Sequence, residues 1–190
     1  MNTRPAPNGF TLIEVLIALL VLAIGALGAS SLILQARRAA QQSSLSSSAV
    51  HLAARAADAM RANAIAAAAD ASNPYLQLDY DALADGPPRA ATDCSATPCD
   101  SAALAEADLA FLRRTMFDHF PLGRIKICRD GAAFDSGAMA LRWQCDRASN
   151  VPAMIKIGWR LRVPDGGAAA GAAPVIIALP LALRTNGSAP

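Results

Sequence analysis

The sequence has few of the residues that mark an enzyme or a large soluble core. Of its 190 residues, 5% are aromatic, two are histidines, and the formal net charge is only +2. A charge so close to zero gives no broad electrostatic attraction for nucleic acid. The sequence also has no glycine-rich phosphate loop of the usual type, and no serine or cysteine nucleophile has a plausible base nearby. We therefore expect a protein that is not an enzyme and that uses no cofactor.

One long apolar run dominates the N-terminal part of the chain. Residues 10–34 contain a single charge, that of Glu14, and about 20 apolar residues are enough to span a bilayer as a helix. The segment before the run is polar and carries Arg4, which favours a cytoplasmic N-terminus. A carboxylate inside a bilayer costs about 2.5–3.5 kcal/mol at mid-helix and less near the interface, so Glu14 is a candidate functional residue.

Three interpretations of this run are open. A secretory signal peptide could be cut near Ala26-Leu27-Gly28, although its apolar stretch is normally shorter. A plain membrane anchor would leave Glu14 without a role. The third interpretation rests on the residues that open the run, which read Gly9-Phe10-Thr11-Leu12-Ile13-Glu14 and continue as Val15-Leu16-Ile17-Ala18-Leu19.

This order of residues resembles the class III signal of type IV pilins and pseudopilins. In that family a prepilin peptidase cuts after the glycine, the new N-terminal phenylalanine is N-methylated, and the glutamate helps subunits to align in a filament. The resemblance implies removal of residues 1–9 by cleavage between Gly9 and Phe10, methylation of Phe10 and an assembly role for Glu14. Many members have lysine or arginine where this chain has Asn8, and here Arg4 carries the charge of the leader.

The chain after the apolar run predicts an amphipathic continuation of the same helix. Residues 35–69 contain no proline or glycine and are rich in alanine, which favours helix. Apolar side chains recur at steps of three or four, at Leu45, Ala49, Leu52, Ala56 and Met60. We therefore expect one helix from residue 10 to about residue 69, ended by Asn73-Pro74.

The remaining residues predict a small α+β unit. Residues 70–123 are expected to form a variable surface loop and a second helix, capped by Asp100 or Ser101 and ending near His119. The apolar period then changes to two, which indicates strands at residues 124–129, 141–145, 154–163 and 175–183. Residues 124–190 would hold this antiparallel sheet of about four strands and a C-terminal tail, with Pro180 in an edge strand. A long N-terminal helix packed on such a sheet is the type IV pilin fold.

The four cysteines all follow the apolar run: Cys94, Cys99, Cys128 and Cys145. Their spacing does not match common zinc sites, so we expect no metal and two disulfides if the run crosses a membrane. Cys128 and Cys145 lie in successive predicted strands and can bridge them, while Cys94 and Cys99 can close a small loop. The two histidines, His51 and His119, are expected on a polar helix face and at a helix end.

Two later segments are similar to the PilV minor pilins, a family of type IV pilus modification proteins. Residues 56–63 resemble their Asp-x-Met-Arg-Ala-Asn segment, and residues 105–110 resemble their second helix. The resemblance implies a low-abundance subunit that helps to initiate the pilus. Its partners would be other major and minor pilins, prepilin peptidase, the inner-membrane assembly platform and a tip adhesin. It would sit in the inner membrane with its C-terminal domain in the periplasm, and then in the extracellular pilus.

Two other functions are open on the sequence. A minor pseudopilin of a type II secretion system would have the same N-terminus and a periplasmic role. A DNA-uptake pilin would need a clustered basic surface, whereas the arginines here are scattered. Two arginine pairs, Arg37-Arg38 and Arg113-Arg114, are expected on solvated helix faces. Asp58 and Arg61 are expected to form an exposed pair three residues apart on the first helix.

Overall fold

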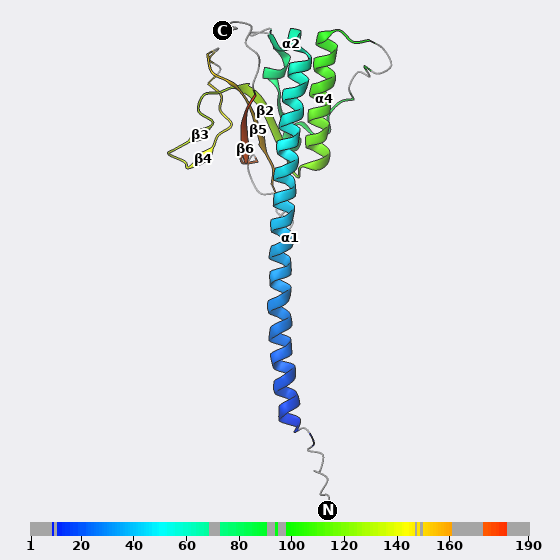
Figure 1. Cartoon of the computed structure of the whole chain (residues 1–190), viewed down its shortest axis with the longest axis vertical. Coiled ribbons are helices and arrows are strands. Elements are labelled where there is room, and N and C mark those ends of the chain that lie inside the picture. The colour runs from blue at the N-terminus through cyan, green and yellow to red at the C-terminus, as the bar shows by residue number, and fades with distance from the viewer. Residues whose placement is uncertain are drawn as a thin grey trace, which may run out of the picture. The chain divides into compact units, whose positions relative to one another are not determined.

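The computed structural model describes residues 9, 11–68, 73–90, 94, 98–146, 148, 150–160 and 173–181. The chain divides into two compact units, residues 1–44 and residues 45–190. Helix α1 (Leu12–Ala62) begins in the first unit and ends in the second (Figure 1). The long helix forms because residues 12–62 have no proline and only two glycines, Gly25 and Gly28.

The described part of the first unit is almost entirely helix. Every residue from 11 to 40 is exposed within the chain. The hydroxyls of Ser30 and Ser31 donate to the carbonyls of Ala26 and Gly28, each over 2.8 Å, so their polar groups are satisfied inside the helix. By length and composition, α1 could cross a membrane.

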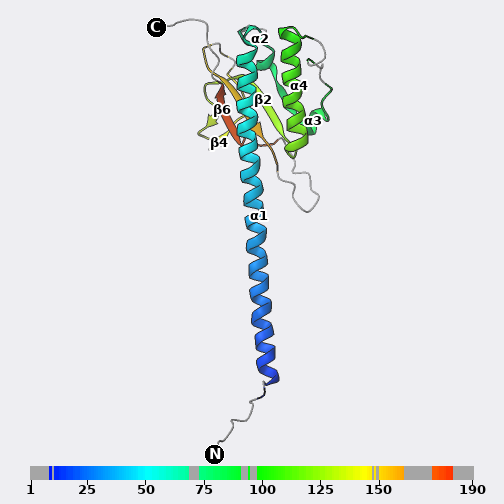
Figure 2. The ribbon, with the colours of Figure 1, turned by 45° about the vertical axis from the view of Figure 1, so that its right-hand side comes forward.

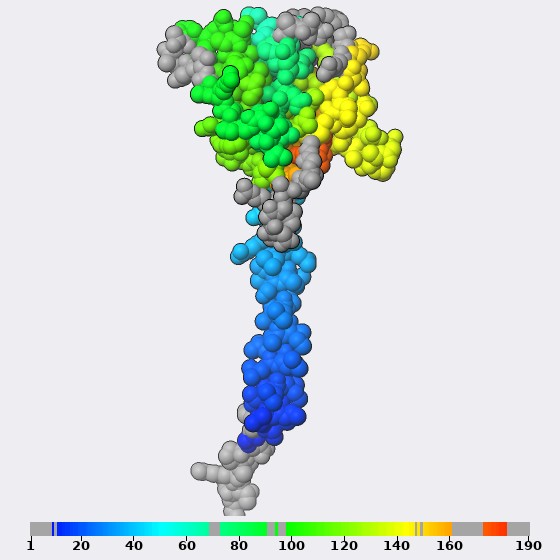
Figure 3. Space-filling view, turned by 180° about the vertical axis from the view of Figure 1, so that it is seen from behind, coloured from blue at the N-terminus to red at the C-terminus, as the bar shows by residue number. Residues whose placement is uncertain are grey.

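The second unit is built on a four-stranded antiparallel sheet. Its strands are β1 (Asp79–Asp81), β2 (Arg124–Arg129), β5 (Ala153–Gly158) and β6 (Ile177–Leu181), in the order β1-β2-β5-β6. A separate hairpin of β3 (Phe134–Asp135) and β4 (Ala140–Leu141) stands out from the side of this unit in the space-filling view (Figure 3). β6, which contains Pro180, is an edge strand as expected.

Helices and short turns cover the inner face of the sheet. They are α2 (Ala64–Ala68), the 3-10 helix η1 (Pro74–Gln77), α4 (Ser101–His119) and the C-terminal part of α1, whereas α3 (Ala82–Asp85) follows the edge strand β1 and has no buried residue. Figures 1 and 2 show α4 running alongside this part of α1. The guanidinium of Arg55 on α1 lies 3.9 Å from the ring centre of Phe111 on α4, which joins the two helices at their exposed side.

The core of the second unit combines a helix stripe with the inner face of the sheet. Ala49, Leu52, Ala56 and Met60 are buried on α1, and Leu45 is partly buried beside them. The buried side chains of the sheet layer alternate along the strands, as strand geometry requires, and are Tyr80, Ile125, Ile127, Ile155, Ile157 and Trp159. The α+β fold and the helix stripe were predicted from the sequence and are confirmed.

Helix α4 also follows its prediction. The Asp100 side chain caps the helix by accepting a hydrogen bond of 2.8 Å from the amide of Ala103. Apolar side chains spaced three or four residues apart form its buried stripe, which consists of Ala105, Leu109, Leu112, Met116 and Phe120. The Phe120 ring lies 5.6 Å from the ring of Trp159, which attaches the end of α4 to the sheet.

Several predicted boundaries were wrong. Residues 74–90 are not merely a surface loop, because they form η1, β1 and α3 and bury Tyr75, Leu78 and Tyr80. Residues 141–145 are not a sheet strand: only Ala140–Leu141 pairs, and it pairs with β3. The first helix turns at Asn63 before continuing as α2 to Ala68. The strand predicted at 154–163 ends at Gly158, and the one predicted at 175–183 begins at Ile177. Residues 161–163 and 182–183 lie outside the described residues.

Candidate functional site

The predicted processing site lies at the start of α1. Gly9 is exposed, and a Cβ added to it would meet no heavy atom within 4 Å, so the chain is open there. Phe10 and the leader residues 1–8 lie outside the described residues. The helix begins when the carbonyl of Thr11 accepts hydrogen bonds from the amides of Glu14, at 3.1 Å, and Val15, at 3.3 Å.

Glu14 occupies the first turn of α1 among exposed apolar side chains. Its neighbours Leu12 and Ile13 are 79% and 65% exposed, and Ile17, one turn later, is 57% exposed. An acidic residue is favoured at this end of a helix by the helix dipole. Within the described part of the chain, Glu14 forms no ion pair. Its carboxylate is therefore available to a positive group outside the described chain.

The segment resembling PilV pilins, residues 56–63, mainly builds the core. Met60 is buried, whereas Asp58 and Arg61 form the predicted exposed ion pair. Asn63 is 4% exposed and donates hydrogen bonds to the carbonyl of Ser101, over 2.7 Å, and to the hydroxyl of Tyr75, over 3.2 Å. Asn63 thus ties the end of α1 to the start of α4, a role that its sequence context did not reveal.

A short polar network continues from Asn63. The Tyr75 hydroxyl donates to the Asp108 carboxylate over 2.7 Å. Burial raises the pKa of Tyr75 well above its usual range, and its hydrogen bond to Asp108 raises that pKa further. The hydroxyl therefore stays protonated and keeps η1 attached to α4.

The four cysteines form the two pairs that were expected. Cys94 is bonded to Cys99, and Cys128 on β2 is bonded to Cys145. Because residue 145 is not in a strand, the second disulfide does not join two strands. It instead closes residues 129–144, which include the β3–β4 hairpin, into a loop attached to β2.

The segment of residues 130–146 covers the outer face of the sheet and buries the charged side chain of Lys156. Lys156 on β5 is 0% exposed, forms an ion pair with the buried Asp130, and donates to the carbonyls of Arg142 and Gln144 over 2.8 and 2.5 Å. All three ammonium protons of Lys156 therefore have acceptors. Burial alone would raise the pKa of Asp130, but hydrogen bonds from Lys156 and from the amide of Ala132 lower it overall.

At the end of β5, the backbone of Gly158 lies close to the backbone of Pro174. A Cβ on Gly158 would lie 2.0 Å from the carbonyl oxygen of Pro174 and 3.0 Å from the ring of Trp143. The Trp143 indole donates to the carbonyl of Ala173 over 2.7 Å and lies over Arg124, whose guanidinium carbon is 4.6 Å from the ring centre. Only glycine fits at position 158.

The other candidates from the sequence have ordinary surroundings. His51 is exposed on α1, and His119 ends α4. Arg114 is exposed and pairs with Asp118 over 3.1 Å, whereas Arg113 is partly buried and pairs with Glu106 over 2.8 Å. Arg37 and Arg38 are exposed on α1. No group of three or more potential metal ligands occurs among the described residues.

Comparison with known protein families gives a match on the N-terminal segment. Residues 4–30 match the prokaryotic N-terminal methylation motif. The matched range includes Gly9, Phe10 and Glu14, and it supports a type IV pilin-like or pseudopilin protein that is processed by prepilin peptidase. No curated protein and no solved structure matches the chain.

Proposed function

We propose that this chain is a minor subunit of type IV pili, cleaved after Gly9, methylated on Phe10 and assembled through α1. The observation that carries the proposal is the methylation motif at residues 4–30, which opens an exposed apolar helix. An exposed apolar helix of this length needs either lipid or other apolar helices around it. A subunit that moves from a membrane into a filament core uses the same surface in both places.

The charge on Glu14 supports an assembly role. Cleavage after Gly9 would leave an ammonium on Phe10, and the Glu14 carboxylate has no described cation to pair with. Two unit charges about 4 Å apart attract by about 4 kcal/mol at an effective dielectric constant near 20. We infer that Glu14 of one subunit pairs with the Phe10 ammonium of its neighbour. Because an unpaired charge would be costly in an apolar core, this pair selects the stagger between subunits.

Composition supports a subunit of low abundance. Aromatic residues make up 5% of the chain, and residues 164–174 consist mainly of glycine and alanine. Most of that segment lies outside the described residues, so its role as a weak lattice contact rests on its sequence alone. The similarity to PilV pilins at residues 56–63 and 105–110 favours a subunit that helps to initiate the pilus. It does not favour the main subunit of the fibre.

Intact-mass spectrometry of the membrane-extracted protein tests the processing step. The mature chain should begin at methylated Phe10. A mature chain that begins near Ala29 would mean cleavage by signal peptidase and would end the filament proposal.

Deletion of the gene in its native host tests the assignment to pili. Surface pili should decrease while the major subunit is still made and processed. Loss of protein secretion with normal pili would instead assign the chain to a secretion pseudopilus. Purified pili that consist mainly of this chain would contradict its minor status.

A further inference from the structure

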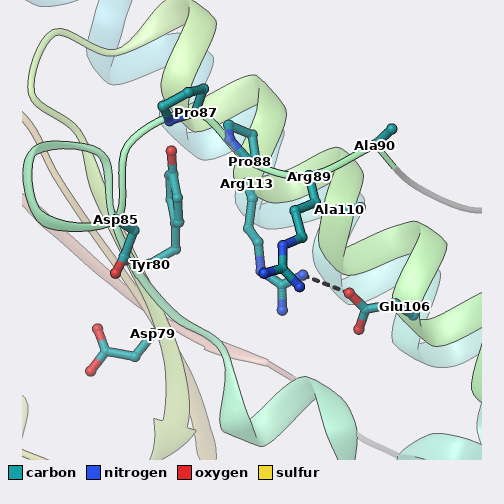
Figure 4. Close-up of a pocket in the computed structure, with 10 residues that line it drawn as sticks. All are labelled: Asp79, Tyr80, Asp85, Pro87, Pro88, Arg89, Ala90, Glu106, Ala110 and Arg113. Carbon is teal, nitrogen blue, oxygen red and sulfur yellow. Dashed lines mark hydrogen bonds and ion pairs between the residues drawn. The ribbon is translucent and has the colours of Figure 1, made fainter.

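A pocket of about 420 Å³ opens in the second unit beside the edge strand β1. Its walls come from β1, from α4 and from residues 85–90, which begin at the last residue of α3 (Figure 4). The volume lies within the range of about 300–1,000 Å³ that is typical of ligand sites. Tyr80, Pro87, Pro88 and Ala110 supply apolar wall, and five charged side chains surround it: Asp79, Asp85, Arg89, Glu106 and Arg113.

The two arginines have unused hydrogen-bond donors. A guanidinium carries five N–H donors. Arg113 forms one hydrogen bond, of 2.8 Å, to Glu106, although its side chain is only 29% exposed. Arg89 has no hydrogen bond or ion pair within the described chain. Figure 4 shows both arginine side chains directed to the Glu106 side of the pocket, with Asp79 and Asp85 on the other side.

Each carboxylate of the pocket accepts at least one hydrogen bond, and Glu106 accepts its bond from Arg113 over 2.8 Å. Asp79 accepts hydrogen bonds from Arg124 and Lys126 at 3.0 and 2.8 Å. Asp85 accepts from the amide of Asp81 over 2.7 Å. The Tyr80 hydroxyl donates to the carbonyl of Gly86 over 2.6 Å. Arg124 and Lys126 pair with Asp79, so with Arg89 and Arg113 four cations stand against the three carboxylates Asp79, Asp85 and Glu106. This balance and the unused guanidinium donors favour a ligand with negative charge.

We propose that this pocket binds the carboxylate of an acidic peptide segment from a partner protein. Arginine and carboxylate form paired, parallel hydrogen bonds that fix the orientation of the ligand. A volume of about 420 Å³ far exceeds one small oxyanion, since a water takes about 30 Å³ of liquid volume. The remaining space, against Tyr80 and Pro87, suits the backbone and methylenes of a peptide. The inference does not depend on the filament role.

The adjacent arginine provides a matched control. Arg114 lies on the same helix, is 63% exposed and pairs with Asp118 outside the pocket. Arg114→Gln therefore removes the same charge from the same helix without changing the pocket. Arg89→Gln removes a side chain with no described polar contacts, so this variant should keep its fold.

The test is a ligand-observed NMR titration of the full chain in detergent micelles. The probes are acetyl-Glu-Glu-amide, acetyl-Gln-Gln-amide and inorganic phosphate at equal ionic strength. The acidic peptide should bind saturably and about tenfold more tightly than the neutral peptide or phosphate, as expected for charge-assisted hydrogen bonds. Arg89→Gln and Arg113→Gln should each weaken its binding by about fivefold or more, and Arg114→Gln by less than about twofold. Glu106→Gln should strengthen binding because it frees Arg113.

Three results would overturn the proposal. The first is a lack of saturable binding of the acidic peptide. The second is an equal loss from Arg114→Gln and Arg89→Gln, which would mean nonspecific charge attraction. The third is phosphate binding as tight as peptide binding, which would assign the pocket to small oxyanions.

Discussion

At the scale of single residues, the outer face of the sheet depends on one buried pair of opposite charges. Lys156 and Asp130 both have side chains that are 0% exposed. Taking two charges out of water is costly, and their attraction offsets this cost only when the remaining donors and acceptors are satisfied. The carbonyls of Arg142 and Gln144 meet this condition for Lys156. This arrangement makes the pair sensitive to the loss of either member.

Replacing Lys156 alone should be costly. Lys156→Met leaves the Asp130 carboxylate buried without its ammonium, which should lower the free energy of unfolding by about 3–5 kcal/mol. The double variant Lys156→Met/Asp130→Leu should recover much of that loss. Lys126→Met is the matched control, because Lys126 lies on the same face and its partner Asp79 keeps Arg124. Denaturant unfolding followed by the fluorescence of Trp143 and Trp159 measures the second unit, and equal losses for Lys156→Met and Lys126→Met would contradict the prediction.

Acid should destabilise the second unit through the same carboxylates. The pKa values of Asp130 and Asp79 are lowered in the folded chain, because hydrogen bonds from Lys156 in one case and from Lys126 and Arg124 in the other outweigh the effect of burial. A lowered pKa stabilises the fold above the ordinary aspartate pKa of about 3.9, and this contribution is lost as pH falls below it. The free energy of unfolding should therefore change little between about pH 7 and 5 and fall below about pH 4. Asp130→Asn should reduce that slope, and the exposed Asp58→Asn should not.

At the scale of elements, regular periodicity was predictable and long-range contacts were not. Helices α1 and α4 were predicted because apolar residues recur along many turns. β1 was missed because Asp79–Asp81 is three residues long and mostly polar, and only its pairing with β2 makes it a strand. Residues 141–145 alternate like a strand, yet the ammonium of Lys156 holds the carbonyls of Arg142 and Gln144 away from the sheet ladder. The charged pocket could not be predicted, because β1, α4 and residues 85–90 meet only in the folded chain.

The disulfide between Cys128 and Cys145 should matter more than the one between Cys94 and Cys99. It spans 17 residues against 5, and the segment that it closes covers Lys156. The chain-entropy treatment assigns about 3 kcal/mol to a loop of this longer length. Cys128→Ser/Cys145→Ser should lose at least that much free energy of unfolding, and Cys94→Ser/Cys99→Ser less. Tryptophan fluorescence of both double variants measures the difference, and a larger loss from the second variant would contradict this ranking.

At the scale of the whole molecule, the two units divide their tasks. The second unit has its own core, both disulfides and both tryptophans. The first unit carries the methylation motif and the exposed apolar part of α1. The fluorescence of the two tryptophans therefore reports on unfolding of the second unit.

Glu14→Gln should separate assembly from processing. Amide in place of carboxylate enters a bilayer more easily, so insertion and cleavage after Gly9 should continue. Association with other pilins should fall, because the proposed pair with a neighbouring Phe10 is lost. Glu14→Asp, which keeps the charge with a shorter reach, should lose less. Cross-linking to the other pilins measures assembly, and the mass of the mature chain measures cleavage. Unchanged cross-linking would mean that Glu14 has no role in assembly. Failed cleavage would mean that Glu14 is recognised by the peptidase.

The course of α1 has a mechanical consequence. The helix that begins at Leu12 also supplies Ala49, Leu52, Ala56 and Met60 to the core and ends beside Asn63, which is hydrogen-bonded to the start of α4. Within the second unit, tension applied to α1 at Leu45 along the helix axis would load these contacts together in shear, so they would not separate one at a time. The force needed to pull this part of α1 out of the second unit should then increase with the number of its turns that are buried.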